Sequence, residues 1–257
     1  MRQKAMMGSV VRRLDVCPST NDVARDLAEA GAAHGTAVVA EEQTAGKGTK
    51  GRRWYSPRSQ GLYVSFVLRP SETGLGPRAL SLLPLAAGLA GADAARDIAG
   101  VAVGLKWPND LVWGKLKFGG ILSESVFRAG TAVFSIIGVG INVAQEERDF
   151  PDDLRSLATS LKLMAGKAIG KEALFVRLCR SLESWYNALR GGRTEDVIRA
   201  YENHMAFSLG DRIVVTAGKN RLPGRFAGLG PEGRLRLESA ERIREIAFDT
   251  IQALDWD

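Results

Sequence analysis

The sequence predicts an α/β protein in which a domain with a mixed sheet precedes a small all-β barrel. Two observations lead to this fold class. Between residues 36 and 142, strand-like segments alternate with one glycine-rich loop and one long helix rich in alanine and leucine. From Phe207 onward the chain consists of short strands and turns, which is typical of a small β-barrel. Because 257 residues with 45% hydrophobic content can bury one large and one small core, we expect domains at 1–206 and 207–257.

The composition narrows the class of protein. No apolar run reaches the length of a membrane-spanning helix, and residues 1–16 lack the pattern of a secretory signal, so we expect a soluble, cytoplasmic protein. Cys17 and Cys179 are far apart, which suggests neither a disulfide framework nor a zinc site. The net charge of +6 leaves a non-enzymatic nucleic-acid-binding protein open as an alternative, although much of that charge lies in one loop. Only 18 residues precede Ser19, which is too few for a DNA-binding domain.

The first predicted helix begins at residues 19–22, Ser-Thr-Asn-Asp, and ends at Ala30-Gly31. Hydroxyl and amide side chains at a helix start cap free backbone N–H groups, and glycine commonly follows the last residue. Residues 36–41 then have the pattern of a buried strand, and residues 61–69 that of a second strand. The glycine-rich loop lies between these two strands.

The loop from Glu41 to Pro57 is the centre of the predicted site. Between Gly46 and Arg53 it contains three glycines and four cations, so backbone amides can approach an anion closely while side chains neutralise it. It is neither a dinucleotide loop nor a P-loop, because no helix follows it and Arg52-Arg53 stands where Lys-Ser/Thr is required. A phosphate ester such as an adenylate is the expected ligand, and a solvated basic loop is the alternative.

The middle of the chain predicts one buried helix and several strands. Residues 77–98 are apolar almost all round, as expected for a helix packed against a sheet. Residues 101–106 form a short strand that runs into a turn at residues 107–110, Trp-Pro-Asn-Asp. Two hairpins follow, residues 111–113 with 116–118 and residues 120–127 with 131–139.

The remaining elements lead to the domain boundary. Residues 145–160 read as a loop with acidic residues and proline, and residues 171–190 as a long amphipathic helix. Thr194 is expected to cap a second helix. The change to short strands places the boundary near residue 206.

Five motifs occur in a fixed order, and together they make the chain resemble the biotin protein ligases, most strongly over residues 15–142. They are Ser-Thr-Asn at 19–21, the glycine loop ending at Trp54, Lys-Trp-Pro-Asn-Asp-Leu at 106–111, Lys-x-Gly-Gly-Ile-Leu at 117–122 and Gly-x-Gly-x-Asn at 138–142. The resemblance implies an α/β (α+β) mixed-sheet catalytic domain similar to the class II aminoacyl-tRNA synthetase core, followed by an SH3-like barrel. It implies a short form of the family, without the N-terminal DNA-binding domain and repressor function of some members.

The resemblance also implies an activity. In this family the biotin carboxylate attacks the α-phosphate of ATP, giving biotinyl-5′-adenylate and pyrophosphate, and a carrier lysine then takes the biotin and releases AMP. ATP and Mg²⁺ are the implied cofactors, and the biotin carboxyl carrier domain of a biotin-dependent carboxylase is the implied partner. We therefore expect a biotin–[biotin carboxyl carrier protein] ligase, with no DNA or membrane partner and with a homodimer left open. A lipoate or octanoate protein ligase or transferase of the same fold is the alternative function.

The resemblance assigns roles to the motif residues. Lys117 lies between the two reacting anions, helped by Lys47 and Arg52, because a carboxylate and a polyphosphate repel each other until their charge is neutralised. The biotin-binding set is Ser19, Thr20, Asn21, Gln43, Gly46, Lys47, Lys117, Gly119 and Gly120. The ATP and adenylate set is Gly48, Arg52, Trp54, Asn109 and Asn142, and Asp110 is the candidate magnesium ligand. Lys115 is expected to matter little, and no residue stands out as a general base for the second step.

The chain departs from the family pattern at three places. Lys47 replaces the usual arginine, which exchanges a bidentate fork for a point charge. Thr49 replaces a commonly cationic residue, so we expect the loop to hold the adenylate less tightly or to become disordered more readily. Residues 243–257 lack a clear copy of the family's closing motif, and no contact from the barrel to ATP is assigned.

Overall fold

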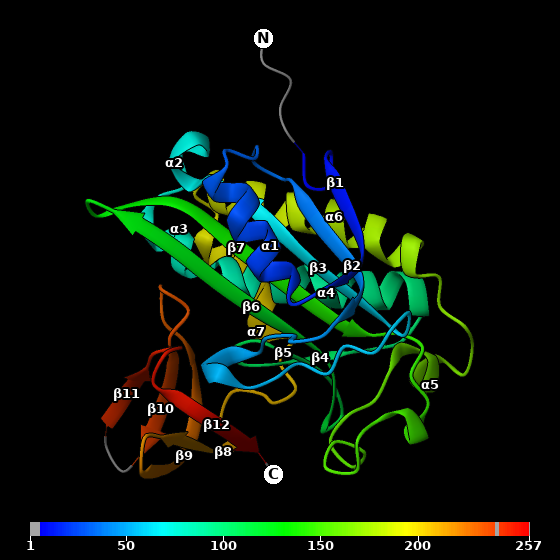
Figure 1. Ribbon diagram of the computed structural model, residues 1–257. Coiled ribbons are helices and arrows are strands. Elements are labelled where there is room, and N and C mark those ends of the chain that lie inside the picture. Colours follow the sequence, from blue (N-terminus) through cyan, green and yellow to red (C-terminus); the bar gives the residue numbers. More distant parts are fainter. Residues whose placement is uncertain (1–5, 240–241, 257) are drawn as a thin grey trace.

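The computed structural model describes residues 6–239 and 242–256, which form two sheets flanked by helices (Figure 1). The larger sheet has the strand order β1-β2-β3-β7-β6-β5-β4. β1 is parallel to β2 and the other neighbouring pairs are antiparallel, so the sheet is mixed, as predicted. Its strands are β1 (Val11–Cys17), β2 (Ala37–Gln43), β3 (Gly61–Leu68), β4 (Gly104–Lys106), β5 (Asp110–Trp113), β6 (Leu116–Arg128) and β7 (Thr131–Asn142).

Helices cover both faces of this sheet. α4 (Leu83–Ala99) and α6 (Lys171–Arg190) lie on one face, and α1 (Thr20–Glu29) lies on the other (Figure 1). Because it is covered on both sides, β3 is buried along its whole length. The other helices are α2 (Pro70–Thr73), α3 (Pro77–Ser81), α5 (Leu161–Ala165) and α7 (Thr194–Asn203). Within the described part of the chain, no helix is long and apolar enough to cross a membrane.

Two predicted elements have different bounds in the structure. The single helix expected at 77–98 is two helices, α3 and α4, which part at Leu82. Pro84 lies in the first turn of α4, where its missing N–H removes no helical hydrogen bond. The strands expected at 116–118 and 120–127 are one strand, β6, because Gly119 and Gly120 keep their pairing with β7.

Two further differences are a strand that was not predicted and a helix cap that lies one residue earlier than predicted. β1 was not predicted, because an edge strand exposed on much of its surface lacks a clear apolar period. Thr194 is the first residue of α7 rather than its cap, and Arg193 takes the cap position. By contrast, α6 has the predicted bounds of residues 171–190.

The C-terminal barrel, residues 207–256, contains a five-stranded antiparallel sheet in the order β11-β10-β9-β8-β12. It docks on the larger domain through Trp107, whose indole Nε1 donates to the Gly233 carbonyl at 2.9 Å and whose ring stacks on Phe248 at 5.3 Å. The connecting segment pairs with β4, since the Leu105 N–H donates to the His204 carbonyl at 2.7 Å. The strands are β8 (Arg212–Ala217), β9 (Asn220–Leu229), β10 (Leu235–Ser239), β11 (Arg242–Ile246) and β12 (Ile251–Trp256). The division of the chain at residue 206 stays a prediction.

His34 gives the fold a pH dependence that can be measured. Its Nδ1 accepts the Arg69 backbone N–H at 3.1 Å, and its ring packs on Tyr186. Burial lowers the pKa of His34 below its usual value of 6.5, against the opposing pull of Glu183 and Glu72. The unfolded chain therefore binds more protons below pH 6.5, and the free energy of unfolding should fall as pH drops from 6.5 toward the lower folded pKa.

Urea unfolding between pH 8 and pH 5 measures this slope. The His34→Asn variant keeps an acceptor without the titration and should show a smaller slope. His204→Asn is the matched control and should retain the slope because it retains His34. An equal slope in His34→Asn and in the unsubstituted protein would contradict the assignment.

Candidate functional site

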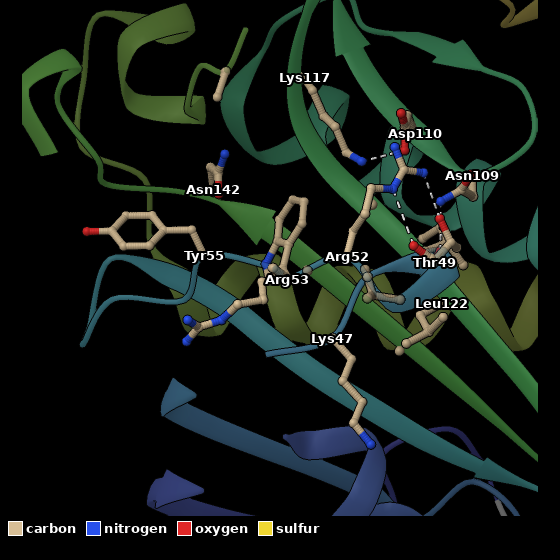
Figure 2. Close-up of a pocket in the computed structure, with 18 of the residues that line it drawn as sticks. Lys47, Thr49, Arg52, Arg53, Tyr55, Asn109, Asp110, Lys117, Leu122 and Asn142 are labelled. Carbon is tan, nitrogen blue, oxygen red and sulfur yellow. Dashed lines mark hydrogen bonds and ion pairs between the residues drawn. The ribbon is translucent and has the colours of Figure 1, made fainter. Parts of the chain in front are cut away.

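A cavity of about 360 Å³ opens beside the glycine loop and contains most of the residues singled out by the sequence (Figure 2). Its walls come from the start of α1, the end of β2, the loop between β2 and β3, the β5–β6 hairpin, the end of β7 and the segment 150–158. Segments far apart in the sequence therefore meet around one space. The predicted site residues on its wall are Ser19, Thr20, Asn21, Gln43, Lys47, Gly48, Arg52, Trp54, Asn109, Asp110, Lys117, Gly120 and Asn142.

One end of the cavity is polar and uncharged. Gln43 Oε1 accepts the Thr20 backbone N–H at 2.8 Å and lies 3.1 Å from the Thr20 hydroxyl, while Gln43 Nε2 donates to Ser56 Oγ at 2.8 Å. Ser19 has the extended backbone of a helix cap, but its side chain makes no capping bond, contrary to the expected capping role. These contacts fix the Gln43 amide, and Ser19 also lies on the cavity wall, so this part of the cavity is suited to bind a neutral polar group.

Asn21 is held beside this end by the protein itself. Its Nδ2 donates to Glu124 at 2.7 Å, and its Oδ1 lies 2.6 Å from the Ser65 hydroxyl. Arg25 also donates to Glu124, at 2.8 Å, which neutralises the carboxylate. Gly138 is the neighbour on β7, and a Cβ added there would overlap the Asn21 amide oxygen. The first glycine of the Gly-x-Gly-x-Asn motif therefore makes room for Asn21.

Lys117 lies on the cavity wall, paired with Asp110. The distance from Lys117 Nζ to Asp110 Oδ1 is 2.5 Å, and the two side chains face each other across the β5–β6 hairpin (Figure 2). The backbone of Lys117 is also fixed, because its N–H donates to the Leu157 carbonyl at 2.8 Å and its carbonyl accepts from the Thr159 N–H at 3.0 Å. Lys117 is therefore a cation whose position is fixed by the fold, in contrast to a freely solvated lysine.

The glycine loop is folded back on itself next to this pair. The Gly48 N–H donates to the Arg52 carbonyl at 2.7 Å, and the Trp54 N–H donates to the Gly46 carbonyl at 2.8 Å. The Arg52 guanidinium donates to the Thr49 hydroxyl at 3.0 Å, so the threonine found where a cation is usual orients Arg52 (Figure 2).

Lys47 lies apart from the other cations of the loop. Its ammonium group pairs with Asp22 of α1, and its side chain points toward that helix rather than toward Lys117 (Figure 2). Lys47 is therefore the predicted site cation that the structure does not bring next to Lys117.

Trp54 covers the glycine-rich strands. A Cβ added at Gly140 would meet Trp54 Nε1 at 2.5 Å, and one added at Gly120 would meet the ring at 3.4 Å. The Lys117 ammonium lies 5.3 Å from the centre of the Trp54 ring. Trp54 Nε1 is buried and has no hydrogen-bond partner among the residues that the structure describes. Bare glycine backbone is therefore needed here so that the indole can lie flat on the floor of the cavity.

Asn109 and Asn142, the asparagines of two of the motifs, line the cavity and also hydrogen-bond to backbone carbonyls. Asn109 Nδ2 donates to the Ile121 carbonyl at 3.2 Å. Asn142 Nδ2 donates to the Thr159 carbonyl at 3.0 Å, and its Oδ1 accepts from Gln145 at 3.2 Å. An amide group has two N–H bonds and two lone pairs, so both side chains keep capacity to bind a ligand.

Two predicted residues lie outside the cavity wall. Gly119 faces the core, where an added Cβ would meet Leu111 at 2.6 Å. Gly46 lies inside the loop, where an added Cβ would meet the Trp54 carbonyl oxygen at 2.5 Å and Ser56 Oγ at 2.7 Å. Both glycines therefore act on the site through close packing.

Several wall residues were missed by the sequence analysis. Lys106 and Lys115 line the cavity at the side of the barrel, and Lys115 donates to the Trp256 carbonyl at 3.0 Å, so it is not a neutral control for Lys117. Burial lowers the pKa of Lys106. Residues 150–158, which the sequence analysis described only as a loop, contribute an apolar part of the cavity wall. The regular spacing of their apolar residues was the signal that could have identified them: Phe150, Leu154, Leu157 and Ala158.

Comparisons with known proteins agree on one family. The Biotin/lipoate A/B protein ligase family matches residues 14–142. The bifunctional ligase/repressor BirA of Bacillus spizizenii is 34% identical over 241 residues, covering 94% of this chain and 73% of the relative. The biotin–[acetyl-CoA-carboxylase] ligase of Mycobacterium tuberculosis is 31% identical, covering 91% and 86%. The structure of a biotin protein ligase from Aquifex aeolicus in complex with biotin and ATP has a TM-score of 0.82 at 29% identity, covering 97% of this chain and 100% of that one.

The Gly138 contact gives a test of the site's construction. Gly138→Ala should lower the free energy of unfolding by about 1–3 kcal/mol, because the added methyl group overlaps a buried, hydrogen-bonded amide. Urea unfolding measures the change. Gly76→Ala is the matched control, since a Cβ there meets nothing within 4 Å. Equal stability of the two variants would contradict the described packing of Asn21.

Proposed function

Because the chain belongs to the Biotin/lipoate A/B protein ligase family, we propose that it is a biotin protein ligase that attaches biotin to a lysine of a carrier domain at the expense of ATP. The observation that carries the proposal is the position of Lys117. It lies on the wall of a cavity to which Thr20 and Gln43 bring neutral polar groups and Arg52 and Lys106 bring cations, and it is paired with Asp110. A cavity lined by both kinds of group suits a neutral ring joined to a carboxylate together with a polyphosphate.

Biotin binding is assigned to the neutral end. The ureido ring of biotin has donors and acceptors that must be paired when buried, since each one left unpaired costs about 1–3 kcal/mol. Thr20 and Gln43 offer hydroxyl and amide groups whose geometry is already fixed, and Ser19 adds a hydroxyl on the cavity wall.

The first step joins two anions. The biotin carboxylate attacks the α-phosphorus of ATP, the bond to the pyrophosphate leaving group breaks, and biotinyl-5′-adenylate forms. Lys117 neutralises charge at the point where the two anions meet, and Asp110 keeps its ammonium group in place. Arg52 lies beside this point and adds positive charge.

The second step transfers biotin from the adenylate to a lysine amine of the carrier, with AMP as the leaving group. No general base is assigned to this step, because the carboxylate beside Lys117, that of Asp110, is already paired with the ammonium group, and the adenylate is itself strongly activated. Closeness and orientation of the incoming amine therefore supply most of the acceleration. Asn109, Asn142 and Trp54 are the groups assigned to hold the adenosine part.

Mg²⁺ fits this site as a companion of ATP. Among residues 6–239 and 242–256, no group of three histidine, cysteine or acidic side chains can hold a metal ion alone. Magnesium is usually bound by one or two carboxylates together with substrate phosphates, and Asp110 supplies one carboxylate at the cavity wall. Asp110 is therefore the residue that would hold Mg²⁺, which would screen the phosphate charge.

The acceptor is proposed to be the biotin carboxyl carrier domain of a biotin-dependent carboxylase. The named specificity of the Mycobacterium tuberculosis and Paracoccus denitrificans relatives, both biotin–[acetyl-CoA-carboxylase] ligases, supports this choice. Mass spectrometry of a carrier domain after incubation with this protein, biotin and ATP tests it directly. Biotin on one lysine is expected. Modification by lipoate but not by biotin would favour the alternative within the same family.

Lys117→Ala should leave the fold intact and abolish biotin-dependent pyrophosphate release, because it removes the cation between the two anions. Circular dichroism checks the fold, and a pyrophosphate assay checks the reaction. Lys167→Ala is the matched control, since Lys167 is exposed and lies outside the cavity wall. Near-normal pyrophosphate release by Lys117→Ala would refute the role of this residue.

Gly46→Ala should raise the KM for biotin by roughly tenfold, as expected if overpacking against the Trp54 carbonyl costs about 1–3 kcal/mol and opens the loop. Steady-state kinetics measure the change. Gly170→Ala is the control, because the nearest atom to a Cβ there is 3.8 Å away. Unchanged biotin kinetics in Gly46→Ala would count against the role of the loop.

A further inference from the structure

Trp256, at the end of β12 in the barrel, contacts two lysines of the cavity wall. The Lys106 ammonium lies 5.2 Å from the centre of the Trp256 ring, and Lys115 Nζ donates to the Trp256 carbonyl at 3.0 Å. Both lysines line the cavity. A residue of the small domain therefore contacts two cations of the site in the large domain.

Trp256 is itself fixed relative to the larger sheet. It pairs with Ile213 of β8, and its ring packs on Phe207 at 5.7 Å. Phe207 follows a segment bonded to β4, since the Ala206 N–H donates to the Leu105 carbonyl at 2.9 Å. Leu105 immediately precedes Lys106, so the same strand carries both the docking contact and the lysine.

The surroundings of Lys106 favour an anionic ligand. Lys106 is half-buried, and burial lowers its pKa, with Lys117 and Arg52 lowering it further and Asp110 and Asp255 raising it. Several cations brought together repel one another unless an anion lies between them. The part of the cavity wall at Lys106 is therefore suited to the β- and γ-phosphates of ATP.

We propose that Trp256 is a positioning residue, which holds Lys106 through its ring and Lys115 through its carbonyl so that both ammonium groups face the polyphosphate of ATP. This inference rests on the proposed ligase function and gives the barrel a part in it. A tryptophan ring attracts an ammonium group at its face, and a backbone carbonyl restricts a flexible lysine to fewer conformations. The contact leaves the Lys106 charge available to the ligand.

Trp256→Leu tests the contact made by the ring while keeping an apolar side chain against Phe207. The KM for ATP should rise by roughly three- to tenfold, the range expected for loss of a cation–π contact. The biotin affinity, measured by calorimetry without ATP, should stay unchanged. A merely structural role would change both quantities together, whereas a positioning role changes only the one for ATP.

Trp113→Leu is the matched control. Trp113 lies on β5, in the same hairpin as Lys115, but it is exposed and outside the cavity wall. Its KM for ATP should equal that of the unsubstituted protein. Lys106→Met should raise the KM for ATP at least as much as Trp256→Leu, and the double variant should resemble Lys106→Met alone, since the ring acts through the lysine.

Three results of the Trp256→Leu experiments would overturn the proposal. They are an unchanged KM for ATP in Trp256→Leu, an equal loss of biotin affinity, and full additivity with Lys106→Met. If Trp256→Leu lowers the melting temperature, its kinetics no longer isolate the contact with Lys106, and the Lys106→Met variant takes its place. An unchanged KM for ATP in Lys106→Met then overturns the proposal as well. An unsubstituted protein without biotin-dependent pyrophosphate release would defeat the ligase function itself and this inference with it.

Discussion

The ion pair between Lys117 and Asp110 fixes the point in the cavity where negative charge can be neutralised. Its partners lie on neighbouring strands, and the backbone of Lys117 is bonded on its other side to the segment 157–159. An unpaired surface lysine adopts many conformations, whereas the ammonium group of this one is held on the cavity wall by Asp110. The other parts of the cavity wall bring neutral polar groups and further cations to the same cavity as this ammonium group.

The two sides differ in chemistry because different layers of the fold supply them. The start of α1 and the end of β2 bring hydroxyl and amide groups that hydrogen-bond one another and carry no charge. The glycine loop and the strand β4, next to the barrel, bring cations. We therefore propose that one cavity holds a neutral ring and a polyphosphate in a fixed order, with the reacting atoms next to Lys117.

Much of this arrangement could be predicted from the sequence, because the motifs are local. The glycine loop, the Lys-Trp-Pro-Asn-Asp segment and the Gly-x-Gly-x-Asn segment each end a strand, and strand ends of one sheet gather at its edge. Side-chain partners across the sheet were not predictable. The pairing of Lys47 with Asp22 and the contact of Asn21 with Gly138 depend on how α1 packs, which no local pattern encodes. The contribution of Lys106 and Lys115 was missed because it depends on the docking of the barrel.

A crystal structure of the protein with biotin and a non-hydrolysable ATP analogue tests the placement of charge at Lys117 most directly. The predicted result has the ureido ring beside Thr20 and Gln43, the triphosphate beside Arg52 and Lys106, and the carboxylate and α-phosphate within reach of Lys117 Nζ. Ligands bound elsewhere, with Lys117 facing open solvent, would contradict it.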